Sequence, residues 1–145
     1  MATERFMIPF AVFLILEKGG QIHLQRPYNT GYRDGEYDLT AGHMEGNESV
    51  QQTIIREAKE EIGIGLHEED LKVLHVMHNT NDADYFNIFL AASTWVGEPK
   101  NMEPEKCDDV RWFAKDSLPS PLTPHVHQAL ANIRNGIFYS NFGGN

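Results

Sequence analysis

The N-terminal part of the chain combines one long apolar run with a shorter alternating segment. Residues 6–16 are apolar throughout and rich in aromatic and branched side chains, whereas polar and apolar residues alternate over 21–25. Both patterns are typical of β-strands. Gly19 and Gly20 lie between the two segments, where a tight turn is required. The pattern therefore predicts a β-hairpin.

Residues 50–62 have the periodicity of a helix instead. Apolar side chains recur three and four positions apart, and the stripe consists of Val50, Ile54, Ile55, Ala58 and Ile62. Ser49, with Gln52 three positions further on, forms a capping-box pattern at the start of this segment. Gly63 is a typical residue for the end of a helix. These signals predict a helix that begins near Val50 and stops at Gly63.

The rest of the chain alternates short apolar segments with clusters of turn-forming residues. We predict strands over 37–41, 71–78, 85–95 and 110–113, irregular loops over 26–36 and 97–109, a second helix over 125–135 and a mobile tail over 140–145. The order is strand, helix, strand, helix, without an internal repeat or a low-complexity linker. Because 145 residues is close to the usual size of one domain, we expect a single α/β (α+β) domain over 1–145.

The composition excludes several classes of protein. Hydrophobic residues make up 41% of the chain, enough for a globular core, and 21 acidic against 12 basic residues give a formal charge of −9. This charge disfavours binding to duplex nucleic acid, which needs a basic surface. The N-terminal apolar run is too short for a membrane span of about 20 residues, and a single cysteine, Cys107, cannot close an internal disulfide. We therefore expect a cytoplasmic protein without membrane contact, with Cys107 as a buried or half-buried thiol.

The acidic residues are concentrated in one segment. Residues 42–70 contain eight acidic residues and two basic ones, a local charge of −6. On the predicted helix, Glu57, Glu60 and Glu61 lie within an arc of about 100°. Like charges at this spacing destabilise a helix unless something neutralises them, and Mg²⁺ and Mn²⁺ prefer oxygen ligands. The spacing alone leaves two interpretations open, a divalent cation site and a solvated acidic face.

The residues around this stripe resemble the Nudix box. The signature G-x5-E-x7-R-E-U-x-E-E-x-G-U matches residues 42–64 at every fixed position, which are Gly42, Glu48, Arg56, Glu57, Ala58, Glu60, Glu61, Gly63 and Ile64. The segment is therefore similar to the Nudix hydrolase superfamily, and the resemblance implies an α/β/α sandwich with a central mixed β-sheet. Ala58 replaces a larger aliphatic residue and Ala41 replaces a common glycine, but neither change removes a carboxylate.

The resemblance also implies a metal site. In the family, the carboxylates at the positions of Glu57, Glu60 and Glu61 bind Mg²⁺ or Mn²⁺. The backbone carbonyl of Ala41 would be a further ligand, because a carbonyl survives the change from glycine to alanine.

Further roles follow from the same resemblance. Arg56 and Glu48 would pair and hold the loop and the helix in register. His43 and Glu48 are candidate substrate-binding residues near the phosphates, although an exposed loop imidazole is an equally open interpretation for His43.

Two places remain open for the general base. Nudix enzymes take it from the box, here Glu57, or from a loop after the later strands, here residues 97–106 with the sequence GEPKNMEPEK. That loop resembles the one in MutT-like members and in the human nucleotide diphosphatase that acts on thiopurine and oxidised guanine nucleotides. Glu103 falls where a base or further metal-ligating carboxylate is expected, with Glu105 as its rival and a plain surface glutamate as the alternative. The candidate catalytic residues are thus Arg56, Glu57, Glu60 and Glu103.

The functional prediction is a MutT-like Nudix hydrolase that uses Mg²⁺ or Mn²⁺ to split a phosphoanhydride bond of a nucleoside tri- or diphosphate, with guanine and oxidised nucleotides among the candidates. One alternative is a Nudix hydrolase for another nucleoside diphosphate derivative, such as ADP-ribose or a dinucleoside polyphosphate. The other is a non-catalytic nucleotide-binding protein on the same scaffold. The expected partner is a small nucleotide, and the resemblance implies a monomer or a homodimer. Base and sugar preference stay open.

Overall fold

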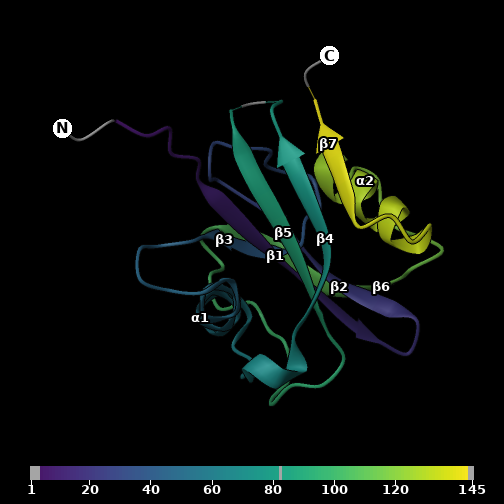
Figure 1. Ribbon diagram of the computed structural model, residues 1–145. Helices are drawn as coiled ribbons and strands as arrows, with labels where there is room; N and C mark the ends of the chain where they lie inside the picture. Colours follow the sequence, from purple (N-terminus) through teal and green to yellow (C-terminus); the bar gives the residue numbers. More distant parts are fainter. Residues whose placement is uncertain (1–3, 82, 144–145) are drawn as a thin grey trace.

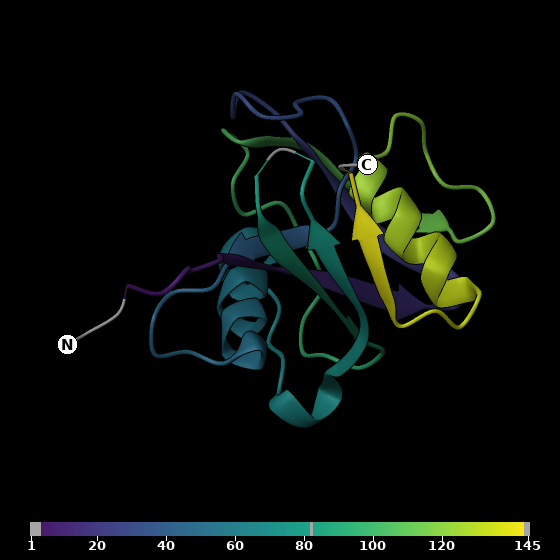
Figure 2. The same cartoon turned by 45° about the horizontal axis from the view of Figure 1, so that its top comes forward.

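In the computed structural model, which describes residues 4–81 and 83–143, a mixed seven-stranded sheet lies between two helices (Figure 1, Figure 2). The elements are β1 (Phe10–Lys18), β2 (Gln21–Pro27), β3 (Thr40–His43), α1 (Val50–Ile62), the 3₁₀ turn η1 (Glu68–Asp70), β4 (Lys72–Asn79), β5 (Tyr85–Ala92), β6 (Cys107–Ala114), α2 (Pro124–Arg134) and β7 (Tyr139–Phe142). The strand order is β6-β2-β1-β5-β4-β7, and β3 pairs with β1 beside this path. Pairs β1–β5 and β4–β7 are parallel and the others antiparallel. The predicted sandwich with a mixed sheet is confirmed.

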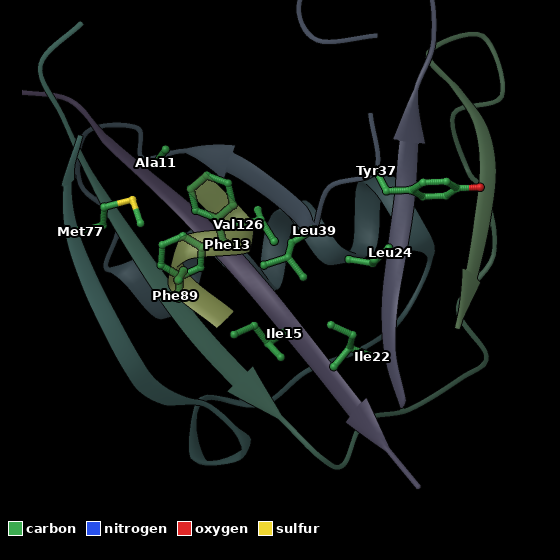
Figure 3. Close-up of a cluster of buried hydrophobic side chains, with 11 residues drawn as sticks. Ala11, Phe13, Ile15, Ile22, Leu24, Tyr37, Leu39, Met77, Phe89 and Val126 are labelled. Carbon is green, nitrogen blue, oxygen red and sulfur yellow. The ribbon is translucent and has the colours of Figure 1, made fainter. Parts of the chain in front are cut away.

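The central strand β1 is buried on both faces, which explains its apolar sequence without alternation. Phe13 and Ile15 belong to the cluster that α2 covers (Figure 3). Leu14 and Leu16 point the other way, into the cluster that α1 covers. The ring of Phe13 stacks on Phe89 of β5 with centroids 4.6 Å apart. Each helix is thus fixed to its own face of the sheet.

The helix α1 has the bounds that the sequence predicted. The Ser49 hydroxyl accepts a hydrogen bond from the Gln52 amide at 3.1 Å, and the Gln52 side chain accepts one from the Ser49 amide at 2.8 Å. Gly63 ends the helix in a left-handed conformation with φ of 71°. In the described ranges 4–81 and 83–143, no helix is long and apolar enough to cross a membrane.

The predicted hairpin is confirmed as β1 and β2, although β1 begins at Phe10 rather than at residue 6. The side chains of Phe6 and Met7 are 78% and 84% exposed and lie outside the core. The strand predicted over 110–113 starts earlier, because β6 pairs with β2 from Cys107 onward. Cys107 is buried, as expected.

The strand predicted over 37–41 lies later in the chain than expected. β3 covers Thr40–His43 and pairs with β1. Tyr37 and Asp38 form only isolated bridges, Asp38 with Gln25. The chain therefore leaves the sheet edge at Asp38 and re-enters it at Thr40, directly before α1.

The prediction of a mobile tail over 140–145 is wrong for its first residues. β7 (Tyr139–Phe142) pairs in parallel with β4. The buried His75 of β4 lies 2.8 Å from the Ser140 hydroxyl through its Nε2 atom. The strand β4 supplies backbone and side-chain partners for these residues, and the local sequence of 140–145 alone does not predict this pairing. Residues 144–145 lie outside the described residues.

Candidate active site

The contact between α1 and β3 places a carboxylate directly against a glycine. The Glu57 side chain fills the space beside Gly42, and a Cβ atom at Gly42 would overlap the Glu57 carboxyl group. Because the φ of Gly42 is not in the left-handed region, the requirement is for space rather than for backbone freedom. Glycine at this position therefore lets Glu57 lie against the strand.

Arg56 connects the acidic residues of this region. Its guanidinium lies 2.8 Å from Glu48 (Nη2 to Oε1), 3.2 Å from Glu57 (Nη1 to Oε1) and 3.8 Å from Glu60 (Nη1 to Oε2). It also donates a hydrogen bond to the His43 carbonyl at 3.3 Å. The Arg56 guanidinium thus connects the end of β3, the following loop and two carboxylates of α1.

Glu48 anchors the loop between β3 and α1. Its carboxylate accepts hydrogen bonds from the Thr53 hydroxyl at 2.8 Å and from the Glu45 amide at 2.9 Å, in addition to the Arg56 contact. The Arg56 hydrogen bond, followed by these two, lowers the pKa of Glu48 to about 2. Glu48 pairs with Arg56 as expected, and its oxygens are occupied within the loop, so contact with a substrate stays a prediction.

The carboxyl group of Glu57 has a strongly raised pKa. Burial, the largest cause, and the charges of Glu60 and Glu103 together raise the pKa of Glu57 to about 7 against the opposing charge of Arg56. The charged form of Glu57 is therefore disfavoured, since one guanidinium does not compensate two neighbouring carboxylates and the loss of water.

Glu61 is more buried than Glu57, and its side-chain hydrogen-bond partner is neutral. Burial raises the pKa of Glu61 to about 8, and the charges of Glu57 and Glu103 act in the same direction. Gln25 of β2 opposes this shift, because its Nε2 atom donates a hydrogen bond to Glu61 Oε1 at 2.8 Å. The Ala41 backbone also hydrogen-bonds the Glu61 carboxyl and lowers its pKa. Glu61 therefore lies where α1, β2 and β3 meet.

The loop over 97–106 folds back onto the C-terminal end of α1. The Met102 amide donates a hydrogen bond to the Glu61 carbonyl at 3.1 Å. Asn101 holds the following turn, because its Oδ1 accepts a hydrogen bond from the Glu103 amide at 3.0 Å and its Nδ2 donates one to the Cys107 carbonyl at 2.7 Å. The loop thus brings the charge of Glu103 close enough to act on the carboxyls of α1. Glu105 is exposed.

The donors of this region are oxygen atoms, which suits Mg²⁺ or Mn²⁺. Within the part of the chain that the structure describes, no group of three or more His, Cys, Asp or Glu side chains is gathered in the arrangement of a metal site. The assignment of individual ligands therefore stays a prediction, supported by the raised pKa of the half-buried carboxyls of Glu57 and Glu61.

A cavity of about 430 Å³ opens beside the carboxylates, between β3 and the N-terminal end of α2. Its lining is aromatic, small and polar, and consists of Ala11, Phe13, Tyr32, Asp38, Ala41, Gly42, His43, Asn79, Ala83, Tyr85, Asn87 and His125. The ring of His43 stacks on Tyr85 with centroids 5.5 Å apart. Gly42 lines the cavity and contacts Glu57 as well, so it forms the border between the two regions.

The structure brings most of the predicted site residues together. These are Arg56, Glu57, Glu60, Glu61 and Glu103, with the Ala41 backbone against Glu61. His43 lies at the cavity wall, whereas Glu105 shows no contact with the group. Three polar residues of the region were missed, Gln25, Asp38 and Asn101. Asp38 gave a signal, a charged residue between the apolar Tyr37 and Leu39 in a predicted strand.

Comparison with known families and proteins identifies relatives of the chain as a whole. The family described as the NUDIX domain matches residues 6–133. Among curated proteins, the NAD-capped RNA hydrolase NudC of Stutzerimonas stutzeri (strain A1501) is 26% identical over 110 residues, and that of Vibrio vulnificus (strain CMCP6) is 30% identical over 121 residues. These alignments cover 76% and 79% of the chain but only 38% and 44% of the relatives, so the chain spans less than half of their length.

Solved structures with the same fold align with this chain over most of both chains. The crystal structure of a MutT NUDIX hydrolase from Burkholderia pseudomallei has a TM-score of 0.79 and 27% identity, over 87% of this chain and 98% of the other. The MutT protein of Bacillus halodurans has a TM-score of 0.75 at 20% identity, over 92% and 88%. The second likeness concerns the fold alone.

Proposed function

The chain belongs to the NUDIX family of hydrolases, which act on pyrophosphate bonds, and on that premise we propose that it splits a phosphoanhydride bond of a nucleoside tri- or diphosphate with Mg²⁺ or Mn²⁺. The observation that carries this proposal is the border at Gly42, with the crowded Glu57 on one side and a cavity of about 430 Å³ on the other. Anionic phosphates approach such carboxylates only with a cation between them. A cavity of this size accommodates a nucleoside.

Glu57, Glu60, Glu61 and the Ala41 carbonyl would hold the cation. The fit rests on the electrostatics of the pair Glu57 and Glu61, whose raised pKa values reflect burial and mutual repulsion that a divalent cation would relieve. A bound cation supplies charge neutralisation on the phosphates and a water molecule of lowered pKa.

The other residues of the region orient this arrangement. Arg56 fixes the loop after β3 through Glu48 and keeps Glu57 and Glu60 side by side. Glu103 and Glu57 are the candidates to accept the proton of the attacking water, because both lie in the same carboxyl group cluster. Substitution of each by glutamine separates them, since loss of the base changes the pH dependence of kcat.

The test is phosphate release from a panel of nucleoside di- and triphosphates, with and without Mg²⁺ or Mn²⁺. We expect turnover that requires the metal. If no nucleotide is hydrolysed with either metal but some are bound, the non-catalytic interpretation replaces the enzymatic one.

A second candidate substrate is a dinucleotide with a central pyrophosphate bond. The observation that favours it is the alignment with two NAD-capped RNA hydrolases over three quarters of this chain. The same panel should therefore include NAD and ADP-ribose. Faster cleavage of NAD than of all mononucleotides would assign the chain to this second class.

A further inference from the structure

The cavity beside the carboxylates contains one charged residue. Of the described residues that line it, none is Lys or Arg, and Asp38 is the sole acid. A phosphate group is therefore disfavoured inside the cavity, since it would meet the Asp38 carboxyl group where the described lining residues include no Lys or Arg to neutralise it. The aromatic wall of Phe13, His43 and Tyr85 suits a flat heterocycle instead.

Asp38 lines the cavity with a carboxyl group that can accept hydrogen bonds. The side chain is only 18% exposed, and it lines the cavity. Its Oδ1 accepts a hydrogen bond from the Leu39 amide at 2.7 Å, while the nearest cationic candidate, His125 Nε2, lies 3.9 Å from Oδ2, beyond hydrogen-bond length. The side chain of Thr123 also contacts the carboxyl group and lowers its pKa. A carboxylate has about four acceptor sites, so capacity remains beyond these partners for N–H donors from a bound molecule.

We propose that Asp38 determines the base specificity of the nucleotide substrate by accepting hydrogen bonds from an exocyclic amino group of the heterocycle. This inference rests on the proposed function, because it concerns the base of the same substrate. Asn87, which is buried at the same cavity and whose Nδ2 makes a long contact of 3.8 Å to the Met77 sulfur, is a further polar group available to the base.

The carboxylate form of Asp38 separates guanine from hypoxanthine. It accepts hydrogen bonds from the neighbouring ring N–H and amino group of guanine, one on each oxygen. Hypoxanthine lacks the amino group and leaves one oxygen without a partner, which costs affinity. The carboxylic acid form offers one donor and one acceptor, so it pairs with cytosine and uracil alike. Because burial raises the pKa of Asp38 to about 7, the carboxylate form predominates only above neutrality.

The matched pair GTP and ITP, assayed at about pH 8 where Asp38 is mainly a carboxylate, tests the proposal, since the two nucleotides differ only in the amino group. We expect the wild type to prefer GTP at least about tenfold in kcat/KM. In Asp38→Asn the preference should fall below about threefold, because the asparagine amide offers one donor and one acceptor and so also fits hypoxanthine. Asp116→Asn, at an aspartate whose side chain is 95% exposed, is the control and should keep the preference.

Binding of the monophosphates GMP and IMP, measured by calorimetry, separates this inference from the proposed function. A preference for GMP in binding without turnover of any substrate would overturn the proposed function and support the role of Asp38. Turnover with less than twofold preference for GTP over ITP, or a preference that Asp38→Asn retains, would overturn the role of Asp38 alone. The wild-type pair decides the matter even if Asp38→Asn does not fold, which circular dichroism would report.

Discussion

Half-buried carboxyl groups with a raised pKa occur in two neighbouring regions of this protein, and their surroundings differ. On the α1 side, Glu57 and Glu61 are crowded by Glu60 and Glu103, so that several negative charges compete for one space. On the cavity side, Asp38 is the sole acid among the described lining residues, and burial is the largest cause of its shift.

The difference suggests two ligands of different charge. A crowded group of carboxyls loses more energy by mutual repulsion than hydrogen bonds can return, so it calls for a divalent cation. A single buried carboxyl needs only neutral N–H donors, which a heterocycle supplies. Gly42 borders both regions, so one nucleotide can place its phosphates in the first and its base in the second.

The strongest test of the crowded region is Glu61→Gln. The change keeps the size of the side chain and its contact with Gln25 but removes a charge that the cation requires. We expect kcat to fall at least about 100-fold, without a loss of melting temperature, since a buried acid is removed. Glu69→Gln on the exposed turn η1 is the control. Near wild-type kcat in Glu61→Gln would contradict the metal assignment.

A smaller effect is expected from Gly42→Ala, which changes the border between the regions without changing any charge. The new Cβ would push the Glu57 carboxyl group away from β3, and displacement of a catalytic group by about 1 Å costs up to about 100-fold in rate. We therefore predict that kcat falls by about 10- to 100-fold. Gly46→Ala is the matched control, because a Cβ at Gly46 meets no atom within 4 Å. Equal kcat values in the two variants would show that the close approach of Glu57 is dispensable.

The sequence predicted the crowded region far better than the cavity. The helix α1 depends on local signals, such as the Ser49 cap and the Gly63 stop, and its carboxylates follow from helical spacing. Gln25 is 36 residues from its partner Glu61, and the cavity position of Asp38 depends on α2, which lies far along the chain. β7 was missed for the same reason, because β4 supplies its partners. Contacts of this kind arise from topology rather than from local pattern.

The loop that carries Glu103 can be weakened without touching a carboxyl group. Asn101→Ala removes two hydrogen bonds, to the Glu103 amide and the Cys107 carbonyl, so Glu103 should be held less firmly. We expect a loss of about tenfold in kcat, with little change in KM. In the Asn101→Ala background, Glu103→Gln should cost less than in the wild type, since coupled residues are not additive. Glu105→Gln, in the same loop, should match the wild type. Full additivity would contradict the positioning role of Asn101.

The smallest predicted effect concerns the stability of the cavity region as a function of pH. The pKa of Asp38 is raised from 3.8 to about 7 by burial, with the charge of Glu36 raising it and that of Arg33 lowering it. The folded chain therefore holds a proton that the unfolded chain has released, so this contribution is complete below pH 4 and is lost as the pH rises through 7. Between pH 6 and 7 the loss amounts to about 1 kcal/mol. Urea unfolding at both pH values should show a steeper decline for the wild type than for Asp38→Asn, with Asp116→Asn like the wild type. His125, whose Nε2 lies 3.9 Å from Asp38 Oδ2, faces the same carboxyl group in the wild type and in Asp116→Asn. Equal declines would mean that the carboxyl group ionises as freely in the cavity as in water, and the two regions would then differ less than their surroundings indicate.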